Sequence, residues 1–159
     1  MPGLCYTFIM KNLFPPSKFT FSVNGRDIVV QRVAGGKNRP PKLVVTVKGQ
    51  FGGRLLIRFE NGWDRFCKQI GLNREPQVPD RQANDELYFE CDDQEFVNRV
   101  FLSGDLRTKI LDLLTQGFVI DIQPNKCVFT KPYGFEKFDE TECEQLAKSL
   151  ASFTMPLPS

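Results

Sequence analysis

Positively charged side chains are the residues of this chain best suited to contact a partner, and eight of them fall between residues 26 and 58. Three belong to the loop sequence GGKNRPPK at 35–42. This loop lacks the G-x-x-x-x-G-K-[ST] spacing that surrounds a phosphate with backbone amides, so it does not predict a P-loop. We expect the eight cations to form one surface for phosphates, anionic lipid headgroups or an acidic partner. The predicted contact surface consists of Arg26, Arg32, Lys37, Arg39, Lys42, Lys48, Arg54 and Arg58.

The charges are divided unevenly along the chain. Residues 1–74 hold 13 Lys and Arg against 3 Asp and Glu, whereas residues 75–159 hold 8 against 16, so net charges of +10 and −8 underlie the overall +2. Such asymmetry indicates either a basic face that is free for an anionic partner or two halves that neutralise each other. In the second case we expect basic-to-acidic contacts within one fold or between the subunits of a homodimer.

Residue types for catalysis are sparse. The chain has no histidine, which removes the usual acid–base group near neutral pH and the commonest metal ligand. The sequence therefore predicts no catalytic residue, no metal and no cofactor, and it favours a non-enzymatic binding or scaffolding module. An enzyme of unknown class is an alternative if the fold pairs carboxylates such as Asp85 and Asp121 with a basic partner.

The cysteines are odd in number and widely spaced, and no two of them form a C-x-x-C pair. This spacing predicts neither a zinc ribbon nor a disulfide framework. We expect mostly buried thiols in a reducing compartment, which for this chain indicates the cytoplasm. The five cysteines are Cys5, Cys67, Cys91, Cys127 and Cys143.

Nucleic acid or another polyanion is the alternative partner for the basic surface. Proteins that bind single strands display aromatic side chains among their cations for base stacking. In the predicted strands the aromatics share the core-facing side, as Phe59 does with Leu55 and Ile57, and only Phe51, in a glycine-rich loop, is expected to be free. We therefore rank nucleic acid below a protein or an anionic membrane surface.

The basic half has the pattern of an antiparallel meander. Residues 18–23 alternate apolar and polar, and Asn24-Gly25 is typical of a type I′ turn before a return strand at 28–33. Two more strands follow at 43–47 and 55–59, which predicts four consecutive strands with a largely cationic exposed face. After them, apolar residues at helical spacing, Trp63, Phe66, Cys67 and Ile70, predict a helix that ends at Gly71.

The acidic half mixes strands and helices. Residues 73–84 contain two prolines and few apolar residues, so we interpret them as a connector. A strand at 87–91, two helices, a hairpin at 118–131 and a last helix from Asp139 should follow, the last helix burying Cys143, Leu146, Ala147, Leu150 and Phe153. The sequence thus predicts one α+β domain over residues 1–159, with a basic β-rich half at 18–72, the connector at 73–84, an acidic α/β half at 85–153, and three to four helices packed on the sheet.

A longer pattern extends from Leu55 to about Val128. It includes LLIRFE at 55–60, Ile70-Gly71-Leu72, DELYFE at 85–90, Leu106-Arg107 and the pairs Ile110-Leu111 and Leu113-Leu114. This pattern resembles the soluble domain of uncharacterised bacterial membrane-anchored proteins. The resemblance implies that the basic half lies beside an anionic leaflet, where each Lys or Arg adds about 1 kcal/mol of attraction. We therefore expect a cytoplasmic protein at the inner face of the membrane, since the apolar residues 4–10 are too few to cross a bilayer.

Overall fold

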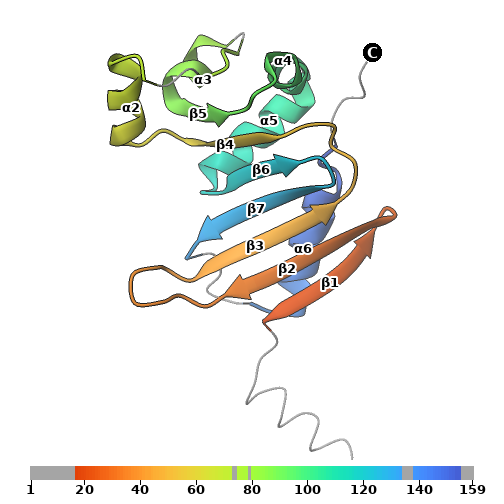
Figure 1. The fold of residues 1–159 in the computed structure, drawn as a ribbon. Coiled ribbons are helices and arrows are strands. Elements are labelled where there is room, and N and C mark those ends of the chain that lie inside the picture. The colour runs from red at the N-terminus through yellow and green to blue at the C-terminus, as the bar shows by residue number, and fades with distance from the viewer. Residues whose placement is uncertain (1–16, 73–74, 79, 134–137, 155–159) are drawn as a thin grey trace, which may run out of the picture.

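Seven antiparallel strands form one sheet in the order β1-β2-β3-β7-β6-β4-β5 (Figure 1). The computed structural model describes residues 17–72, 75–78, 80–133 and 138–154. Its strands are β1 (Lys18–Val23), β2 (Arg26–Val33), β3 (Lys42–Lys48), β4 (Leu55–Phe59), β5 (Leu87–Glu90), β6 (Val119–Gln123) and β7 (Lys126–Pro132). The helices within these residues are α2 (Gly62–Gln69), α3 (Arg81–Glu86), α4 (Gln94–Leu102), α5 (Gly104–Thr115) and α6 (Glu140–Ala151). The expected α+β class is confirmed.

The N-terminal meander is confirmed for its first three strands. Asn24 and Gly25 both adopt positive φ, at 52° and 72°, and join β1 to β2 as the type I′ signal predicts. The prediction that β4 is the fourth strand of this meander is wrong, because the β6–β7 hairpin lies between β3 and β4.

The link between β3 and β4 explains this rearrangement. Its backbone crosses the β6–β7 turn, where the amides of Gly49 and Phe51 donate to the carbonyls of Asn125 (3.1 Å) and Pro124 (2.9 Å). The Phe51 side chain is 2% exposed, so it anchors the crossing in the core. The expectation that Phe51 is free to stack on a base is therefore wrong.

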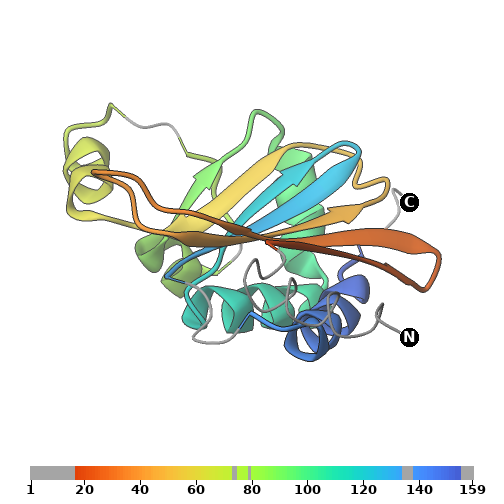
Figure 2. The same ribbon diagram turned by 90° about the horizontal axis from the view of Figure 1, so that it is seen from below.

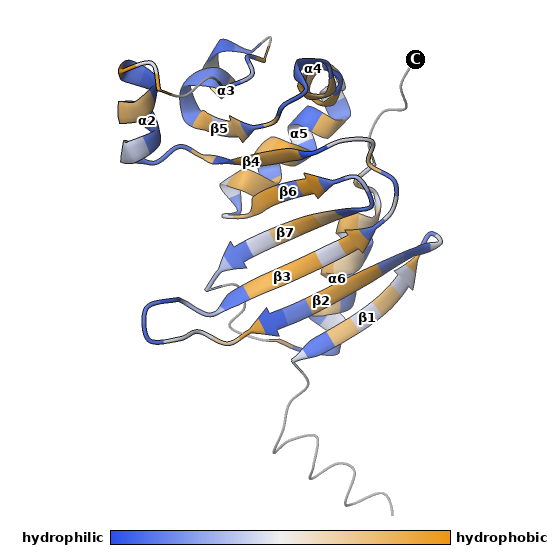
Figure 3. Cartoon of the chain, in the orientation of Figure 1, coloured by the Kyte–Doolittle hydropathy of each residue, from blue (hydrophilic) through white to orange (hydrophobic). Residues whose placement is uncertain are grey.

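Helices cover one face of the sheet. Figure 2 shows α5 and α6 beneath this face, with α6 against β1, β2 and β3 and α5 against β6. The core between the layers is apolar, and Figure 3 shows hydrophobic residues along the central strands. Aromatic rings meet edge to face within it, at centroid distances of 5.1 Å for both Phe89–Phe101 and Phe129–Phe153.

The opposite face of the sheet carries no helix in the described part of the chain (Figure 2). Strand register places small and β-branched side chains side by side along its middle, and these side chains are half-buried. The expectation of a largely cationic strand face is therefore wrong at the centre of the sheet, where the face consists mainly of Val29, Val44, Thr46, Val128 and Thr130.

The predicted connector between the halves is part of the folded structure. Helix α3 begins inside it, and Val78 and Ala83 are buried. The Asn84 side chain donates to the carbonyl of Val78 (2.7 Å) and accepts from its amide (2.9 Å), so one side chain closes this segment on itself. Polar side chains thus supply local order in this segment that its low apolar content does not indicate.

Candidate functional site

The direction of the strands gathers three segments at one end of the sheet. In the order β2-β3-β7-β6-β4 every neighbour is antiparallel, so β2, β7 and β4 run in the same direction and finish at the same end. We call this the β2/β4/β7 end. The β2–β3 loop follows β2, Tyr133 follows β7 and α2 follows β4, and Figure 1 shows the loop and α2 both projecting on the left.

Four of the eight predicted cations lie around the β2–β3 loop at this end, and all four are exposed. None of them forms an ion pair with any residue that the structure describes. Figure 3 shows the loop as a hydrophilic projection. We call these residues the loop cations: Arg32, Lys37, Arg39 and Lys42.

The loop has a defined backbone shape. Gly36 and Arg39 form an antiparallel bridge, with hydrogen bonds of 2.9 and 3.2 Å between their amides and carbonyls. Gly35 is packed so closely that a Cβ on it would lie 2.7 Å from the Arg39 carbonyl oxygen. The Pro41 carbonyl accepts from the Tyr133 amide at 2.8 Å and ties the loop to the end of β7. Lys37 and Arg39 are therefore carried by an ordered turn, and Arg32 and Lys42 lie in the strands beside it.

The other four predicted cations lie elsewhere. Lys48 and Arg54 are exposed at the opposite end of the sheet, where β3 finishes and β4 begins. Arg26 donates to the Phe153 carbonyl at 2.8 Å and lies 5.8 Å from the Phe51 ring centroid, so it supports the core. The last, Arg58, is bound internally. The structure thus places four of the predicted residues on or beside the β2–β3 loop and the other four elsewhere.

Arg58 forms the first part of an ion-pair cluster beneath α2. Its guanidinium donates twice to Asp64, at 2.5 and 2.9 Å, and lies 4.1 Å over the Tyr88 ring. Asp64 is 4% exposed and also completes a capping box with Asn61 at the start of α2. The hydrogen bonds from Arg58 lower the pKa of Asp64 and those to Asp64 raise the pKa of Arg58, while burial raises the pKa of Tyr88.

Lys68 forms the second part of the cluster. Its ammonium group pairs with Glu60 and with Glu75, the latter at 3.1 Å, and donates to the Asn84 carbonyl at 3.0 Å. The side chains of Glu60 and Glu75 are only 2% and 5% exposed. Despite the ion pair, neither oxygen of Glu75 accepts a hydrogen bond from the described residues. Two buried carboxylates thus share one ammonium, with Arg65 3.8 Å from Glu60.

The cluster orients α2 with its charged side toward the body of the protein and its apolar side toward solvent. The exposed fractions are 69% for Trp63, 47% for Phe66 and 51% for Ile70, and the Trp63 and Phe66 rings lie 5.5 Å apart. The helix that the apolar spacing predicts is confirmed, but of its four apolar positions only Cys67 is buried. Neighbours on either side are also exposed, and we call the whole set the α2 apolar stripe: Phe59, Trp63, Phe66, Ile70 and Leu72.

Sequence reasoning missed this surface although a signal for it was present. Asp64 and Lys68 are four residues apart on the side of α2 opposite Trp63 and Phe66, and the preceding strand ends with Arg58 and Glu60. Ion pairs with charged residues of the strand stabilise the orientation in which the charged side of the helix faces the protein. That pattern, taken together with the apolar periodicity, would have predicted the observed orientation.

The carboxylates considered for an enzyme are not assembled into a site. Asp85 is exposed on α3, and Asp121 lies in β6, where its Oδ2 accepts from the Gln123 side-chain amide at 2.8 Å. Asp121 borders a shallow hollow of about 410 Å³ together with Arg54 and Glu90. Within the described ranges, no three His, Cys, Asp or Glu side chains are grouped to hold a metal ion.

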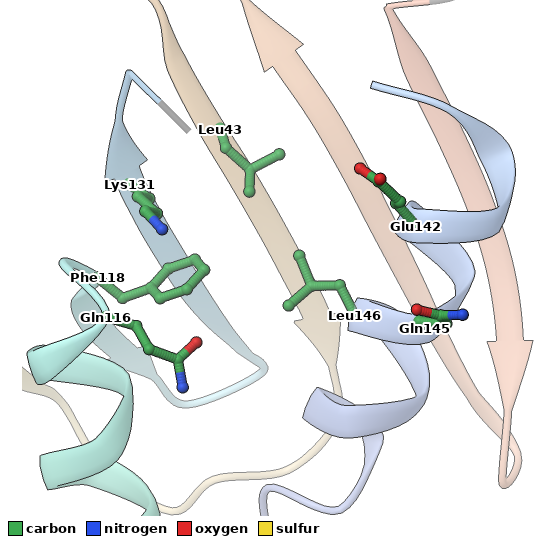
Figure 4. A pocket seen from close by; sticks show the side chains of 7 residues that line it. All are labelled: Leu43, Gln116, Phe118, Lys131, Glu142, Gln145 and Leu146. Carbon is green, nitrogen blue, oxygen red and sulfur yellow. The ribbon is translucent and has the colours of Figure 1, made fainter. Parts of the chain in front are cut away.

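A second hollow lies between α5 and α6 on the helix-covered side. It has a volume of about 380 Å³ and is half open to solvent. Figure 4 shows Phe118 and Leu146 at its apolar floor, with Lys131 on one wall and Glu142 on the other. Lys131 lies 5.6 Å from the Phe118 ring centroid, which holds its charge against the ring. The hollow is thus a shallow groove between two helices, with an apolar floor and one charged side chain of each sign on its walls.

The described cysteines are unpaired thiols, and the expectation of mostly buried thiols is confirmed for them. Cys67, Cys127 and Cys143 are buried and Cys91 is half-buried, whereas Cys5 lies outside the described residues. Burial raises the pKa of Cys143 to about 11 and that of Cys127 well above its usual value. The thiols of Cys127 and Cys143 therefore remain protonated at neutral pH and are poor nucleophiles.

Comparisons of the chain with protein-family models, with curated proteins and with solved structures gave no match. Among the described helices, none has the length and apolar character needed to span a bilayer.

Proposed function

We propose that the protein is a non-enzymatic binding module that docks on an anionic membrane surface through its loop cations. The observation that carries this proposal is the set of four exposed cations on an ordered turn and on the strand ends beside it, without an ion pair to any described residue. Each Lys or Arg near an anionic leaflet contributes about 1 kcal/mol of attraction. Four such contacts are enough for reversible docking.

Internal neutralisation is the competing interpretation, and the ion pairs of the described residues argue against it. Of the eight predicted cations, only Arg58 has a carboxylate partner there, and this partner, Asp64, belongs to the basic half as well. A homodimer joined by basic-to-acidic contacts would use the same loop cations. It is distinguished by its dependence on protein concentration in the absence of lipid.

Nucleic acid is less well supported than a membrane. Base stacking requires aromatic faces next to unpaired cations. Trp63 and Phe66 pack on each other, and the cations around α2, Arg58, Arg65 and Lys68, are each within ion-pair distance of a carboxylate. Of the other members of the α2 apolar stripe, Ile70 and Leu72 are aliphatic and do not stack on bases.

The test is co-sedimentation with vesicles of phosphatidylcholine, with and without phosphatidylserine. Lys37→Glu with Arg39→Glu should abolish binding to the anionic vesicles. Lys48→Glu with Arg54→Glu changes the net charge equally at the opposite end of the sheet and should retain most of the binding. Equal losses in the two double variants would mean that total charge alone matters, and tighter binding to an oligonucleotide than to vesicles would favour the polyanion alternative.

Two adjacent glycines test whether the shape of the turn matters. Gly35→Ala places a Cβ 2.7 Å from the Arg39 carbonyl oxygen and must move the turn, whereas Gly36 has no atom within 4 Å of the added Cβ. We expect Gly35→Ala to weaken vesicle binding severalfold and Gly36→Ala to leave it unchanged. Equal binding of both variants would remove the need for an ordered turn.

A further inference from the structure

Exposed hydrophobic side chains are concentrated at the β2/β4/β7 end. Of the seven large hydrophobic residues exposed in the described part of the chain, five form the α2 apolar stripe and a sixth, Tyr133, ends β7 and is 76% exposed. Only Leu102, at the end of α4, lies elsewhere. The loop cations occupy the same end of the sheet. Apolar and cationic side chains are therefore presented together on one side of the molecule.

The outward orientation of the stripe is built into the fold. Turning α2 over would place Trp63 and Phe66 inside, but it would also separate Asp64 from Arg58 and Lys68 from Glu60 and Glu75. Separating buried charged partners leaves charges without compensation, which is strongly unfavourable. The ion-pair cluster thus holds the stripe in solvent.

The spacing of the two features fits a flat anionic surface. From β2 to β4 the order β2-β3-β7-β6-β4 contains four strand-to-strand steps of about 4.8 Å. The loop and α2 are therefore roughly 19 Å apart across the β2/β4/β7 end of the sheet. A flat surface such as a membrane can therefore contact both at once. Interfacial helices bind through apolar burial together with attraction to anionic headgroups, and Trp and Tyr prefer this depth.

We propose that α2 lies in the interface of an anionic membrane, with the α2 apolar stripe at the boundary of the acyl chains and the loop cations on the headgroups. The inference rests on the proposed function and adds to it a hydrophobic contact that electrostatic docking alone does not include. The exposed carboxylate of Asp85, which lies just before β5 at the same end of the sheet, opposes deeper insertion.

The chain contains a built-in probe for this contact, because Trp63 is its single tryptophan. Anionic vesicles of phosphatidylcholine and phosphatidylserine should shift the emission of the intact protein to shorter wavelength, and lipids with brominated acyl chains should quench it. Leu72→Ser should weaken vesicle binding about tenfold, from the loss of one inserted leucine side chain. Leu102→Ser is the matched control, since the two leucines are 70% and 71% exposed, and it should bind as the wild type does.

Each other outcome overturns the inference. Vesicle binding that depends on Lys37 and Arg39, without a shift in Trp63 emission and without an effect of Leu72→Ser, would retain the proposed function and reject the insertion of α2. Absence of wild-type binding to anionic vesicles would reject both. A Trp63 shift that grows with protein concentration without lipid, together with dimers in analytical ultracentrifugation, would mean that a second copy covers the stripe.

Discussion

Helices α2 and α6 are both amphipathic, yet they face the sheet in opposite ways. α6 begins at Asp139, whose side chain accepts from the Glu142 amide, and it buries Cys143, Ala147 and Leu150 against the sheet. α2 begins with a comparable cap at Asn61, but it buries Asp64 and leaves its apolar stripe in solvent. The apolar side thus faces the sheet in α6 and faces solvent in α2, although both helices show apolar periodicity.

The difference lies in what each helix meets. α6 lies over β1, β2 and β3, whose inward side chains are aliphatic or aromatic. α2 follows the end of β4, where the neighbouring side chains are Arg58, Glu60, Glu75 and Tyr88. A helix buries the side whose groups find suitable partners in the surrounding structure. Charged side chains are buried where neighbouring side chains carry the opposite charge, because the ion pairs offset the cost of removing the charges from water. The four predictions below test this contrast.

Leu150→Ala in α6 should have the largest effect. This side chain is 2% exposed, and truncating a buried leucine costs about 3 kcal/mol of unfolding free energy through lost burial and a residual cavity. Urea denaturation followed by circular dichroism measures the change. A smaller loss of unfolding free energy than that of Ile70→Ser on the α2 apolar stripe would mean that α6 is not the helix that stabilises the sheet.

Asp64→Ala in α2 should cost about 2 kcal/mol, because it leaves the partly buried Arg58 without its carboxylate and removes a capping contact. Asn61→Ala removes the cap alone and is the control. The double replacement of Arg58→Met with Asp64→Leu should cost less than Asp64→Ala, since no charge remains uncompensated. An equal or larger cost of the double variant would contradict the electrostatic account of the orientation of α2.

Low pH should lower the unfolding free energy through the ion pair between Arg58 and Asp64. The hydrogen bonds from Arg58 lower the pKa of Asp64 below its ordinary value of 3.8. The unfolded state therefore binds this proton first as the pH falls, so the contribution of Asp64 is present above that value and is lost below it. The unfolding free energy of the wild type should fall more steeply than that of Asp64→Asn between roughly pH 5 and pH 3. Parallel curves from urea titrations would argue against the pair.

Ile70→Ser on the α2 apolar stripe should have the smallest effect on stability. The side chain is 51% exposed, and surface substitutions change the unfolding free energy by less than about 0.5 kcal/mol. Thermal melts of this variant and of the wild type should coincide within that limit. A large destabilisation would show that the stripe is covered within the chain itself.

Much of the fold is predictable from local patterns. The seven strands, the turn at Asn24-Gly25, the helices at α4, α5 and α6 and the glycine that ends α5 all appear where apolar spacing and turn residues indicate. Helix α3 was not predicted, because its order depends on the Asn84 side chain and on Asp80, whose backbone carbonyl accepts from the Asn84 amide and whose side chain pairs with Arg107. Contacts of this kind leave no periodic signal.

The candidate site was predictable only in part. The loop at 35–42 was recognised by its charge and its glycines, and the structure adds that its turn is ordered. Arg26 and Arg58 were assigned to the contact surface because strand alternation alone does not reveal an internal acceptor. Their partners, the Phe153 carbonyl and Asp64, come from other elements.

The sequence by itself determined the elements of this protein, its charge asymmetry and its basic turn, because each depends on residues within a few positions of one another. Only the tertiary structure decided that a hairpin of the acidic half enters the sheet beside β3, and that Glu60 and Glu75 meet Lys68 beneath α2. That meeting turns an apolar stripe outward beside the loop cations. The physical reason is that compensation of buried charge is a property of neighbours in space, and periodicity along the chain records only neighbours in sequence.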